Sequence, residues 1–298
     1  MLFRSIHPHN PYAPPPGFAR RFTAGIPSTI DGYTRTLLAI EKGRRATSPA
    51  DRDRLRGLYA ASLAYEDSEL ARLLGALREL YPLRETLLVL TADHGDELFD
   101  HGGVLHGFTL YEELLHIPLV VWAPGRVRPG ETSELTDALD LHATLLDLLG
   151  PRPGTAPRGP GRNLFPLLTG RASHLASRLH FAGAPNAAGG FAEVRDGRWK
   201  LIRVAGSRRG WGMGRGPGRT WSRDYLFDLA TDPKESRNLA GTGGVEEQWL
   251  RARLRAWVHE RKLAGRSAQG SRSSGGSGEG PALDEATRQQ LEALGYVE

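Results

Sequence analysis

Two short runs of apolar residues, at positions 86–91 and 117–122, constrain the fold of this chain more than any other feature. Each run has the length of a strand and is apolar at consecutive positions, which is typical of a strand buried in a parallel sheet. A segment with helical periodicity, residues 54–80 after a cap-like Ser48, precedes the first run, and shorter helical segments follow at 111–115 and 140–149. This alternation predicts an α/β fold with a mainly parallel sheet flanked by helices.

A different pattern begins near residue 175. Residues 192–195 and 199–204 predict a strand-turn-strand pair, residues 225–229 one more strand, and residues 245–262 an amphipathic helix, with an Arg/Gly-rich loop at 207–219. We therefore expect a main domain at residues 1–174, a smaller C-terminal β-rich α+β subdomain with a terminal helix at 175–264, a Gly/Ser linker at 265–282 and a C-terminal helix at 283–298.

The composition excludes several classes of partner and site. The 39 Lys and Arg residues are largely balanced by 34 Asp and Glu, and no basic stripe accompanies the net charge of +5, so we expect no nucleic-acid partner. The absence of cysteine excludes disulfides, thiolate metal sites and a cysteine nucleophile. No apolar run is long enough to predict a membrane span, and the first residues lack the pattern of a signal peptide, which leaves the localisation open.

Carboxylates and histidines are concentrated at residues 91–107, directly after the first apolar run. Open α/β sheets bind ligands outside the carboxyl ends of their strands, so this segment is expected to form a metal or anion site. Asp93 and His94 lie nearest the strand end, and they are the predicted ligands of a divalent cation. Three other carboxylates, Asp96, Glu97 and Asp100, are predicted to be exposed charges. His101 is predicted to be a hydrogen-bonding partner of the site rather than a ligand.

One further histidine of this region is a candidate for contact with a substrate. His106 stands shortly before the predicted helix at 111–115, where its imidazole can bind an anion or donate a proton. His9 lies in the proline-rich segment 7–16, which is predicted to be an extended loop because each proline fixes φ and restricts the residue before it.

These motifs carry a resemblance to a known family. The stretch TADHGDELFDHGGVLHGFTLYEELLHIPLVVWAPG resembles the second signature region of the sulfatases, members of the alkaline-phosphatase-like superfamily. HPHNPYAPP resembles that family's loop with a substrate-facing histidine, WKLIR and YLFDLATDPKESRNLA resemble its C-terminal subdomain, and LEALGYVE is similar to the ending of many bacterial members. The resemblance covers nearly the whole chain in the family's order and implies that residues 1–174 are the C-terminal portion of a catalytic domain.

The resemblance implies a sulfuric ester hydrolase that acts on small-molecule or glycan sulfate esters with a divalent cation, usually calcium. Asp93 and His94 match the family's cation ligands. His9 aligns with the histidine that protonates or positions the leaving-group oxygen, and His106 stands where many members have a lysine that touches the sulfate. A sulfate ester requires such groups, because charge must be neutralised on its non-bridging oxygens and a proton supplied to the departing alkoxide.

Two elements of the family's pattern are missing from this sequence. No Asp-Asp pair follows an apolar run, and no Cys/Ser-x-Pro-x-Arg motif is present to provide the formylglycine nucleophile. We therefore expect an N-terminally truncated or incomplete enzyme. The alternatives are a half-enzyme completed by a complementing N-terminal half, a non-catalytic anion-binding half-domain, and a phosphodiesterase or phosphonate hydrolase of the same superfamily.

Overall fold

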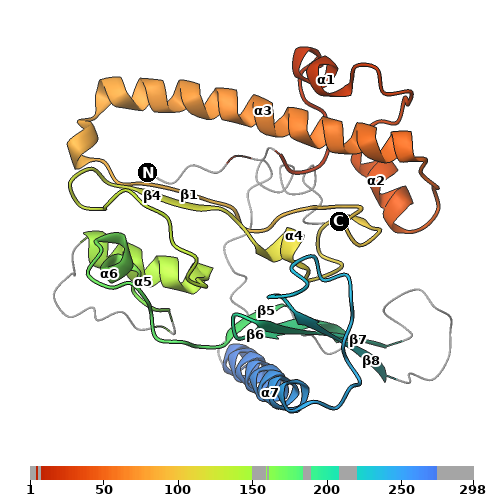
Figure 1. Ribbon diagram of the computed structural model, residues 1–298, viewed down its shortest axis with the longest axis vertical. Helices are drawn as coiled ribbons and strands as arrows, with labels where there is room; N and C mark the ends of the chain where they lie inside the picture. The colour runs from red at the N-terminus through yellow and green to blue at the C-terminus, as the bar shows by residue number, and fades with distance from the viewer. Residues whose placement is uncertain are drawn as a thin grey trace. The chain divides into compact units, whose positions relative to one another are not determined.

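The computed structural model describes residues 5, 8–149, 159, 161–183, 189–207 and 220–273 (Figure 1). The chain divides into two compact units, the first made of residues 1–70, 96–107 and 255–298 and the second of residues 71–95 and 108–254. The predicted Arg/Gly-rich loop, beyond its first residue Ser207, and the predicted C-terminal helix lie outside the described residues. The predicted domain boundaries stay predictions.

The longest helix, α3, runs from Pro49 to Leu80 without a break. Ser48 and Asp51 form a capping box at its start: the Asp51 amide donates to Ser48 Oγ at 3.1 Å, and the Ser48 amide donates to the Asp51 carboxylate at 2.9 Å. Its apolar stripe buries Leu55 and Leu58 inside the first unit. The helical periodicity at 54–80 therefore predicted this element correctly.

The first unit also contains four shorter elements: α1 (Pro16–Thr23), α2 (Thr34–Glu41), β2 (Glu97–Leu98) and β3 (Val104–Leu105). Strands β2 and β3 form an antiparallel hairpin. The Glu41 carboxylate at the end of α2 accepts the Val104 amide at 2.9 Å, which ties the helix to the hairpin. None of these elements was predicted, because each is too short to show a clear period in the sequence.

In the second unit, β1 (Leu88–Thr91) and β4 (Leu119–Trp122) occupy the two apolar runs, and Figure 1 shows them side by side. They pair antiparallel, with Leu88 opposite Trp122, so the predicted parallel arrangement is wrong for this pair. Parallel neighbours need a crossover of a dozen or more residues, usually a helix. The 3₁₀ turn η1 (Leu83–Glu85) precedes β1. The connection from β1 to β4, residues 92–118, contains only the short strands β2 and β3 and the one-turn helix α4 (Glu112–Leu115), so no crossover helix joins the two strands.

The C-terminal part of the second unit is an antiparallel four-stranded sheet in the order β5 (His180–Gly183), β6 (Gly189–Arg195), β7 (Trp199–Ser207) and β8 (Thr220–Asp228). The predicted strand-turn-strand pair and the predicted third strand are confirmed as β6, β7 and β8. Strand β5 was not predicted.

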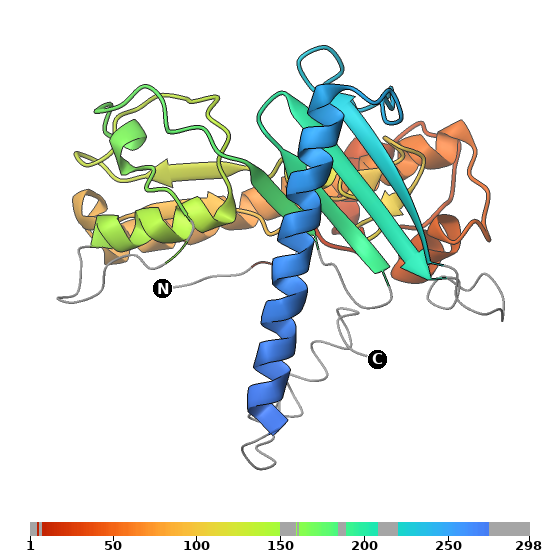
Figure 2. The same cartoon turned by 90° about the horizontal axis from the view of Figure 1, so that it is seen from below.

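One face of this sheet packs against α7 (Val245–Ser273), and Figure 2 shows the helix crossing the sheet. Val194, Leu201 and Leu226 face the same side in neighbouring strands and are buried, as are Leu250 and Leu254 of the helix. Arg251 of α7 pairs with Asp224 of β8 at 2.7 Å. The helix continues beyond the predicted end at residue 262 and includes 265–273 of the predicted linker, where Arg, Ala and Gln are good helix formers.

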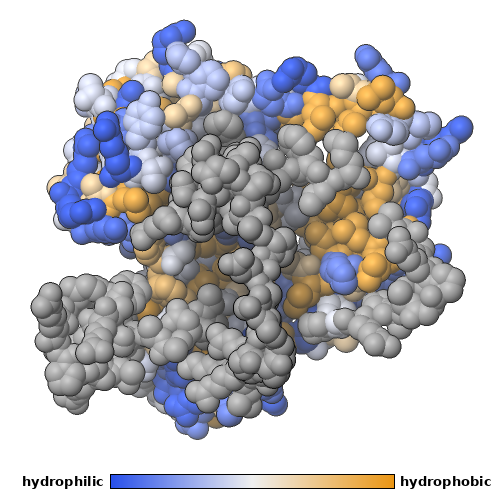
Figure 3. Space-filling view, turned by 180° about the vertical axis from the view of Figure 1, so that it is seen from behind, coloured by the Kyte–Doolittle hydropathy of each residue, from blue (hydrophilic) through white to orange (hydrophobic). Residues whose placement is uncertain are grey.

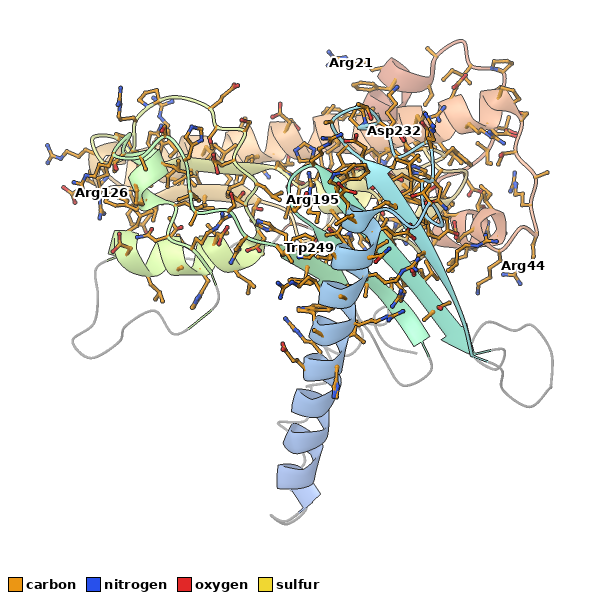
Figure 4. The ribbon with its side chains drawn as sticks, turned by 60° about the horizontal axis from the view of Figure 1, so that its bottom comes forward. Arg21, Arg44, Arg126, Arg195, Asp232 and Trp249 are labelled. Carbon is orange, nitrogen blue, oxygen red and sulfur yellow. The ribbon has the colours of Figure 1, made fainter. Side chains whose placement is uncertain are left out.

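The opposite face of the sheet carries a buried charge cluster formed by Glu112, Glu193, Arg195, Lys200 and Glu235. The Lys200 side chain is 0% exposed, and its ammonium lies 2.8 Å from a carboxylate oxygen of Glu112 and 2.8 Å from one of Glu235. Arg195, labelled in Figure 4 at the end of β6, donates to both Glu112 oxygens at 3.0 and 2.9 Å. This cluster connects β6 and β7 to α4 and to the loop after β8.

A second charge cluster joins α5 (Ala138–Leu149) to the segment before α6 (Phe165–Leu168) and to the start of β5. Asp140, with 0% of its side chain exposed, pairs with Arg162 at 3.0 Å and with Arg178 at 2.7 Å. Asp137 adds pairs with Arg178 at 2.6 Å and with His180 at 3.1 Å. Three segments of the second unit therefore meet at two neighbouring carboxylates.

Apolar areas are visible on the surface in Figure 3. The exposed large apolar side chains include Leu90, Val120 and Trp122 of the β1–β4 pair. Among the residues that the structure describes, no helix has both the length and the apolar character needed to cross a membrane.

Candidate functional site

The proline-rich segment that carries His9 is held firmly inside the first unit. Asn10 donates to Thr34 Oγ1 at 2.9 Å at the start of α2, and the Tyr12 amide donates to the Gly32 carbonyl at 2.9 Å. Gly32 is required at this approach, because a Cβ there would collide with the Tyr12 backbone. The His9 Nδ1 lies 2.8 Å from the Asn10 carbonyl oxygen. A carbonyl only accepts, so Nδ1 carries the proton and Nε2 carries the lone pair in the neutral ring.

His9 and His106, the two predicted substrate-contacting histidines, lie next to each other in the first unit. Their ring centroids are 4.9 Å apart with an interplanar angle of 56°. His106 Nδ1 lies 2.6 Å from Asp96 Oδ1. Two imidazoles from segments almost a hundred residues apart therefore converge, and each is anchored through its Nδ1.

Asp96 is the centre of a hydrogen-bonded group that the sequence did not reveal. Its second oxygen accepts the Tyr12 hydroxyl at 2.9 Å, and the Tyr12 ring contacts the Tyr59 ring edge to face at 5.3 Å. Burial and, after it, the negative charge of Asp96 raise the pKa of Tyr12 above the ordinary range of a phenol. The same two causes raise the pKa of Tyr59 to about 12. Both phenols therefore stay protonated at neutral pH, and Tyr12 remains a donor to Asp96.

The prediction that Asp96 and Glu97 are exposed charges is wrong, whereas Asp100 is exposed as predicted. The Asp96 side chain is only 5% exposed because Tyr12 and His106 donate to its two oxygens. Glu97 is buried because its carboxylate accepts the amides of His101 and Gly103 across the β2–β3 turn, at 3.1 and 2.6 Å. Buried carboxylates with such donors are common in turns, and composition alone cannot separate them from solvated charges.

Asp93 and His94, the predicted cation ligands, belong to the second unit and directly follow β1. His94 Nδ1 lies 2.9 Å from the Gly95 carbonyl oxygen, so Nε2 carries the lone pair in the neutral ring. Gly95 donates its amide to the Leu114 carbonyl at 2.9 Å, and a Cβ at this position would collide with the Glu113 carbonyl. Only glycine fits this close approach of the loop to α4, and its place fixes the backbone beside His94.

The donor set of Asp93 and His94 suits a divalent cation. His94 Nε2 and Asp93 Oδ1 lie 3.8 Å apart, which is compatible with two ligands of one ion bound at about 2.0–2.6 Å from each. A ligating histidine usually donates its other ring N–H to a carbonyl or carboxylate, as His94 does to Gly95. The residues present therefore fit the metal that the sequence predicts.

Sequence reasoning selected the four residues His9, Asp93, His94 and His106, whose roles stay predictions. It did not select Asn10, Tyr12 and Asp96, which the structure places in contact with the segments of His9 and His106. Tyr12 gave one weak signal, an aromatic hydroxyl three residues after His9 in a segment that the prolines hold extended. Asp96 gave another, a third acidic or imidazole side chain beside Asp93 and His94. Neither signal identifies a hydrogen-bond partner, because the contacts join positions 84 and 10 residues apart.

Comparison with known proteins gives three consistent findings. The model of the sulfatase family matches residues 1–151, just over half of the 298-residue chain. Arylsulfatase K of Rattus norvegicus is 29% identical over 62% of this chain and 32% of that protein. The chain thus spans about a third of the length of this curated relative.

Two solved structures show the fold. A protein in complex with its substrate D-glucosamine-2-N,6-O-disulfate matches 78% of this chain and 46% of its own chain, with a TM-score of 0.55 and 21% identity. The phosphonate monoester hydrolase SpPMH from Silicibacter pomeroyi matches 84% of this chain and 50% of its own, with a TM-score of 0.56 and 24% identity. At these identities the likeness shows the fold alone, and it confirms the predicted alkaline-phosphatase-like α/β class.

Proposed function

The chain belongs to the sulfatase family, and from this premise we propose that it carries the anion-binding, proton-donating and cation-binding residues of a sulfate ester hydrolase. The observation that carries the proposal is the pair formed by His9 and His106, whose rings meet at 4.9 Å while each is anchored through Nδ1. When both rings are protonated, each also carries a proton on Nε2, and the two imidazoles can then present two donors to one tetrahedral anion.

We assign His9 to the bridging oxygen of the ester. Hydrolysis of R–O–SO₃⁻ consumes one water and releases R–OH and hydrogen sulfate, so the departing oxygen must gain a proton. In the protonated ring His9 donates from Nε2. Loss of that proton leaves the neutral ring with its proton on Nδ1, which is the tautomer that the Asn10 carbonyl already requires. His106 is assigned to a non-bridging sulfate oxygen.

Asp93 and His94 would hold a divalent cation, for which we propose calcium. In sulfate ester hydrolysis such a cation would neutralise charge on sulfate oxygens and polarise the sulfur centre. These 298 residues contain no Cys and no Ser-x-Pro-x-Arg motif, so we assign no nucleophile to them. The nucleophile and the remaining cation ligands would come from residues outside these 298, on the same polypeptide or on a complementing N-terminal half.

The substrate class follows from the same chemistry. Aryl, small-molecule and glycan sulfate esters all contain the same group, a tetrahedral monoanionic sulfate attached through a bridging oxygen. The relative named arylsulfatase K and the structure that holds D-glucosamine-2-N,6-O-disulfate support this class for the present chain. A phosphonate monoester has the same tetrahedral shape, and it is the natural competitor in any test.

Binding of an anion to the full 298-residue chain tests the proposal. We expect inorganic sulfate and 4-nitrophenyl sulfate to bind with a Kd in the millimolar range, and His9→Ala or His106→Ala to weaken binding at least tenfold, which is about 1.4 kcal/mol for each lost charged donor. Isothermal titration calorimetry measures both. His142→Ala is the matched control, because His142 is an exposed histidine on α5, and it should leave the Kd within twofold. Unchanged binding in both site variants, or tighter binding of a phenylphosphonate monoester than of the sulfate, would refute the assignment.

Calcium gives a second, independent readout. Two ligands from this chain form an incomplete site, so 10 mM calcium should stabilise the fold by roughly 1 kcal/mol or less and raise the Tm by about 2–3 °C. Asp93→Asn should remove this shift, whereas Asp100→Asn, which changes an exposed carboxylate of the same segment, should retain it. Differential scanning fluorimetry with and without EDTA decides the matter. A shift that Asp93→Asn leaves intact would place the calcium elsewhere.

A further inference from the structure

Both oxygens of the buried Asp96 carboxylate are engaged by side chains of the first unit. Oδ1 lies 2.6 Å from His106 Nδ1, and Oδ2 accepts the Tyr12 hydroxyl at 2.9 Å. The side chain is 5% exposed, so these contacts fix its orientation in a site of low water content. A carboxylate held at both oxygens presents a fixed lone pair to His106 rather than one that rotates.

The contact between Asp96 and His106 determines which ring nitrogen of His106 faces a ligand. An ionised carboxylate only accepts, so the proton of the neutral imidazole stands on Nδ1 and the lone pair on Nε2. In the protonated ring, Nδ1–H still points to Asp96 and Nε2–H points outward on the other side of the ring. The same bond sets the plane of the His106 ring, whose centroid lies 4.9 Å from that of the His9 ring.

Tyr12 holds Asp96 in place from the other side. Tyr12 is 1% exposed, its amide donates to the Gly32 carbonyl, and its ring contacts the Tyr59 ring. Tyr12 also stands three residues after His9 on the same rigid segment. The segment that carries His9 therefore also supports His106, because its Tyr12 donates to Asp96 and Asp96 binds His106.

We propose that Asp96 is the positioning residue of the anion site: its bond to Nδ1 fixes the ring orientation of His106, so that the protonated ring directs its Nε2–H at a sulfate oxygen. This inference rests on the proposed function and extends it to a residue that touches no substrate. The same geometry gives the ring, when it is protonated, a directional N–H donor on the side opposite Asp96.

The tautomer of His106 in the full-length chain tests the inference. In the chain labelled with ¹⁵N-histidine, long-range ¹H–¹⁵N spectra distinguish a protonated Nδ1 from a protonated Nε2, and His106→Gln assigns the signals. We expect Nδ1–H in the native chain and a shift toward Nε2–H in Asp96→Asn, together with at least a tenfold loss of affinity for inorganic sulfate. Tyr12→Phe is the control, because it removes one donor to Asp96 but leaves the bond to His106. It should keep the Nδ1–H tautomer and lose less than threefold in sulfate affinity.

The outcomes separate this inference from the proposed function. A native chain whose His106 is protonated on Nε2 overturns the inference without any variant, and so does an Asp96→Asn chain that keeps the native tautomer and the native sulfate affinity. A merely structural role would make Tyr12→Phe and Asp96→Asn equally harmful, and that result also overturns it. If the native chain binds no sulfate while the tautomer changes as expected in Asp96→Asn, the proposed function fails and the positioning of His106 by Asp96 stands.

Discussion

Replacement of Lys200 by methionine is expected to lower the free energy of unfolding of the C-terminal sheet by about 3–5 kcal/mol at neutral pH, the range seen when one partner of a buried ion pair is removed. Methionine retains most of the length and the apolar stem of the lysine, so packing changes little. What is lost is the ammonium, which lies 2.8 Å from both Glu112 and Glu235 and is completely buried.

The effect is large because Lys200 is one of only two cations among the five residues of this cluster. Glu112, Glu193 and Glu235 face Lys200 and Arg195, and the Arg195 guanidinium already binds both oxygens of Glu112. Without Lys200, Glu235 keeps a fully buried carboxylate and loses its cation. The Glu112 amide still donates to Glu235 at 2.6 Å, but burial of a charge without a counter-charge is strongly unfavourable.

The loss should also depend on pH. Burial raises the pKa of Glu193 to about 7, although Lys200 and Arg195 oppose the increase, and burial likewise raises the pKa of Glu235. A carboxyl whose pKa is raised on folding binds more protons in the folded than in the unfolded chain between about pH 4.5 and 7. Its contribution to stability is therefore present below that window and is lost as the pH rises through it. Removing Lys200 raises these pKa values further, so the damage should shrink toward pH 5, where the carboxyls can be neutral.

Urea unfolding followed by tryptophan fluorescence at pH 5 and pH 8 measures both effects. Lys234→Met is the matched control, because Lys234 is an exposed lysine of the same unit, and it should change the unfolding free energy by less than about 0.5 kcal/mol. A loss below about 1 kcal/mol for Lys200→Met at pH 8, or a loss that grows toward pH 5, would show that the buried ammonium does not stabilise the carboxylates around it.

The sequence predicts well those elements whose signals lie within a few consecutive residues. The capping box of Ser48 and Asp51 gives the start of α3, and the alternation around Lys200 gives β7, because both signals lie within a few residues. The direction of β4 relative to β1 was predicted wrongly, since an apolar run records burial but not which way its neighbour runs. Short elements such as α2 and β5 depend on contacts from distant segments and leave no period.

The candidate site divides in the same way. His9, Asp93, His94 and His106 are unusual side chains in motif-like surroundings, so they can be selected from residue type and spacing. Asp96 could not, because an aspartate in a polar loop is exposed far more often than buried. Its burial depends on the hydroxyl of Tyr12, 84 positions away, and no pattern within either segment records that meeting.

Replacement of Asp140 by alanine is the second change for which we expect a loss of about 3–5 kcal/mol in the free energy of unfolding. The Asp140 side chain is completely buried and accepts hydrogen bonds from the Arg162 amide at 2.5 Å, the Arg162 guanidinium at 3.0 Å and the Arg178 guanidinium at 2.7 Å. Alanine would leave two largely buried guanidinium groups without this carboxylate. Arg178 would retain Asp137, but Arg162 would lose its ion pair with Asp140 and the acceptor of its amide.

The pH dependence should differ from that of Lys200→Met. Burial alone would raise the pKa of Asp137, but hydrogen bonds from His180 and the Asp140 amide and the charge of Arg178 outweigh it and lower the pKa to about 2. A carboxyl with a lowered pKa contributes stability that is present above its unfolded value near 4 and is lost only as the pH falls toward 2. Asp137 is therefore still ionised at pH 5 and still pairs with Arg178, and the loss in Asp140→Ala should remain above about 2 kcal/mol there.

The same urea titrations at pH 5 and pH 8 apply to this variant, with Asp147→Ala as the control. Asp147 lies on the same helix, is exposed and accepts a hydrogen bond from Asn163, so its removal should be worth less than about 1 kcal/mol. Equal losses for the two variants would show that the junction of α5, α6 and β5 does not depend on a buried carboxylate. A loss in Asp140→Ala that disappears at pH 5 would contradict the expected persistence of the loss at that pH.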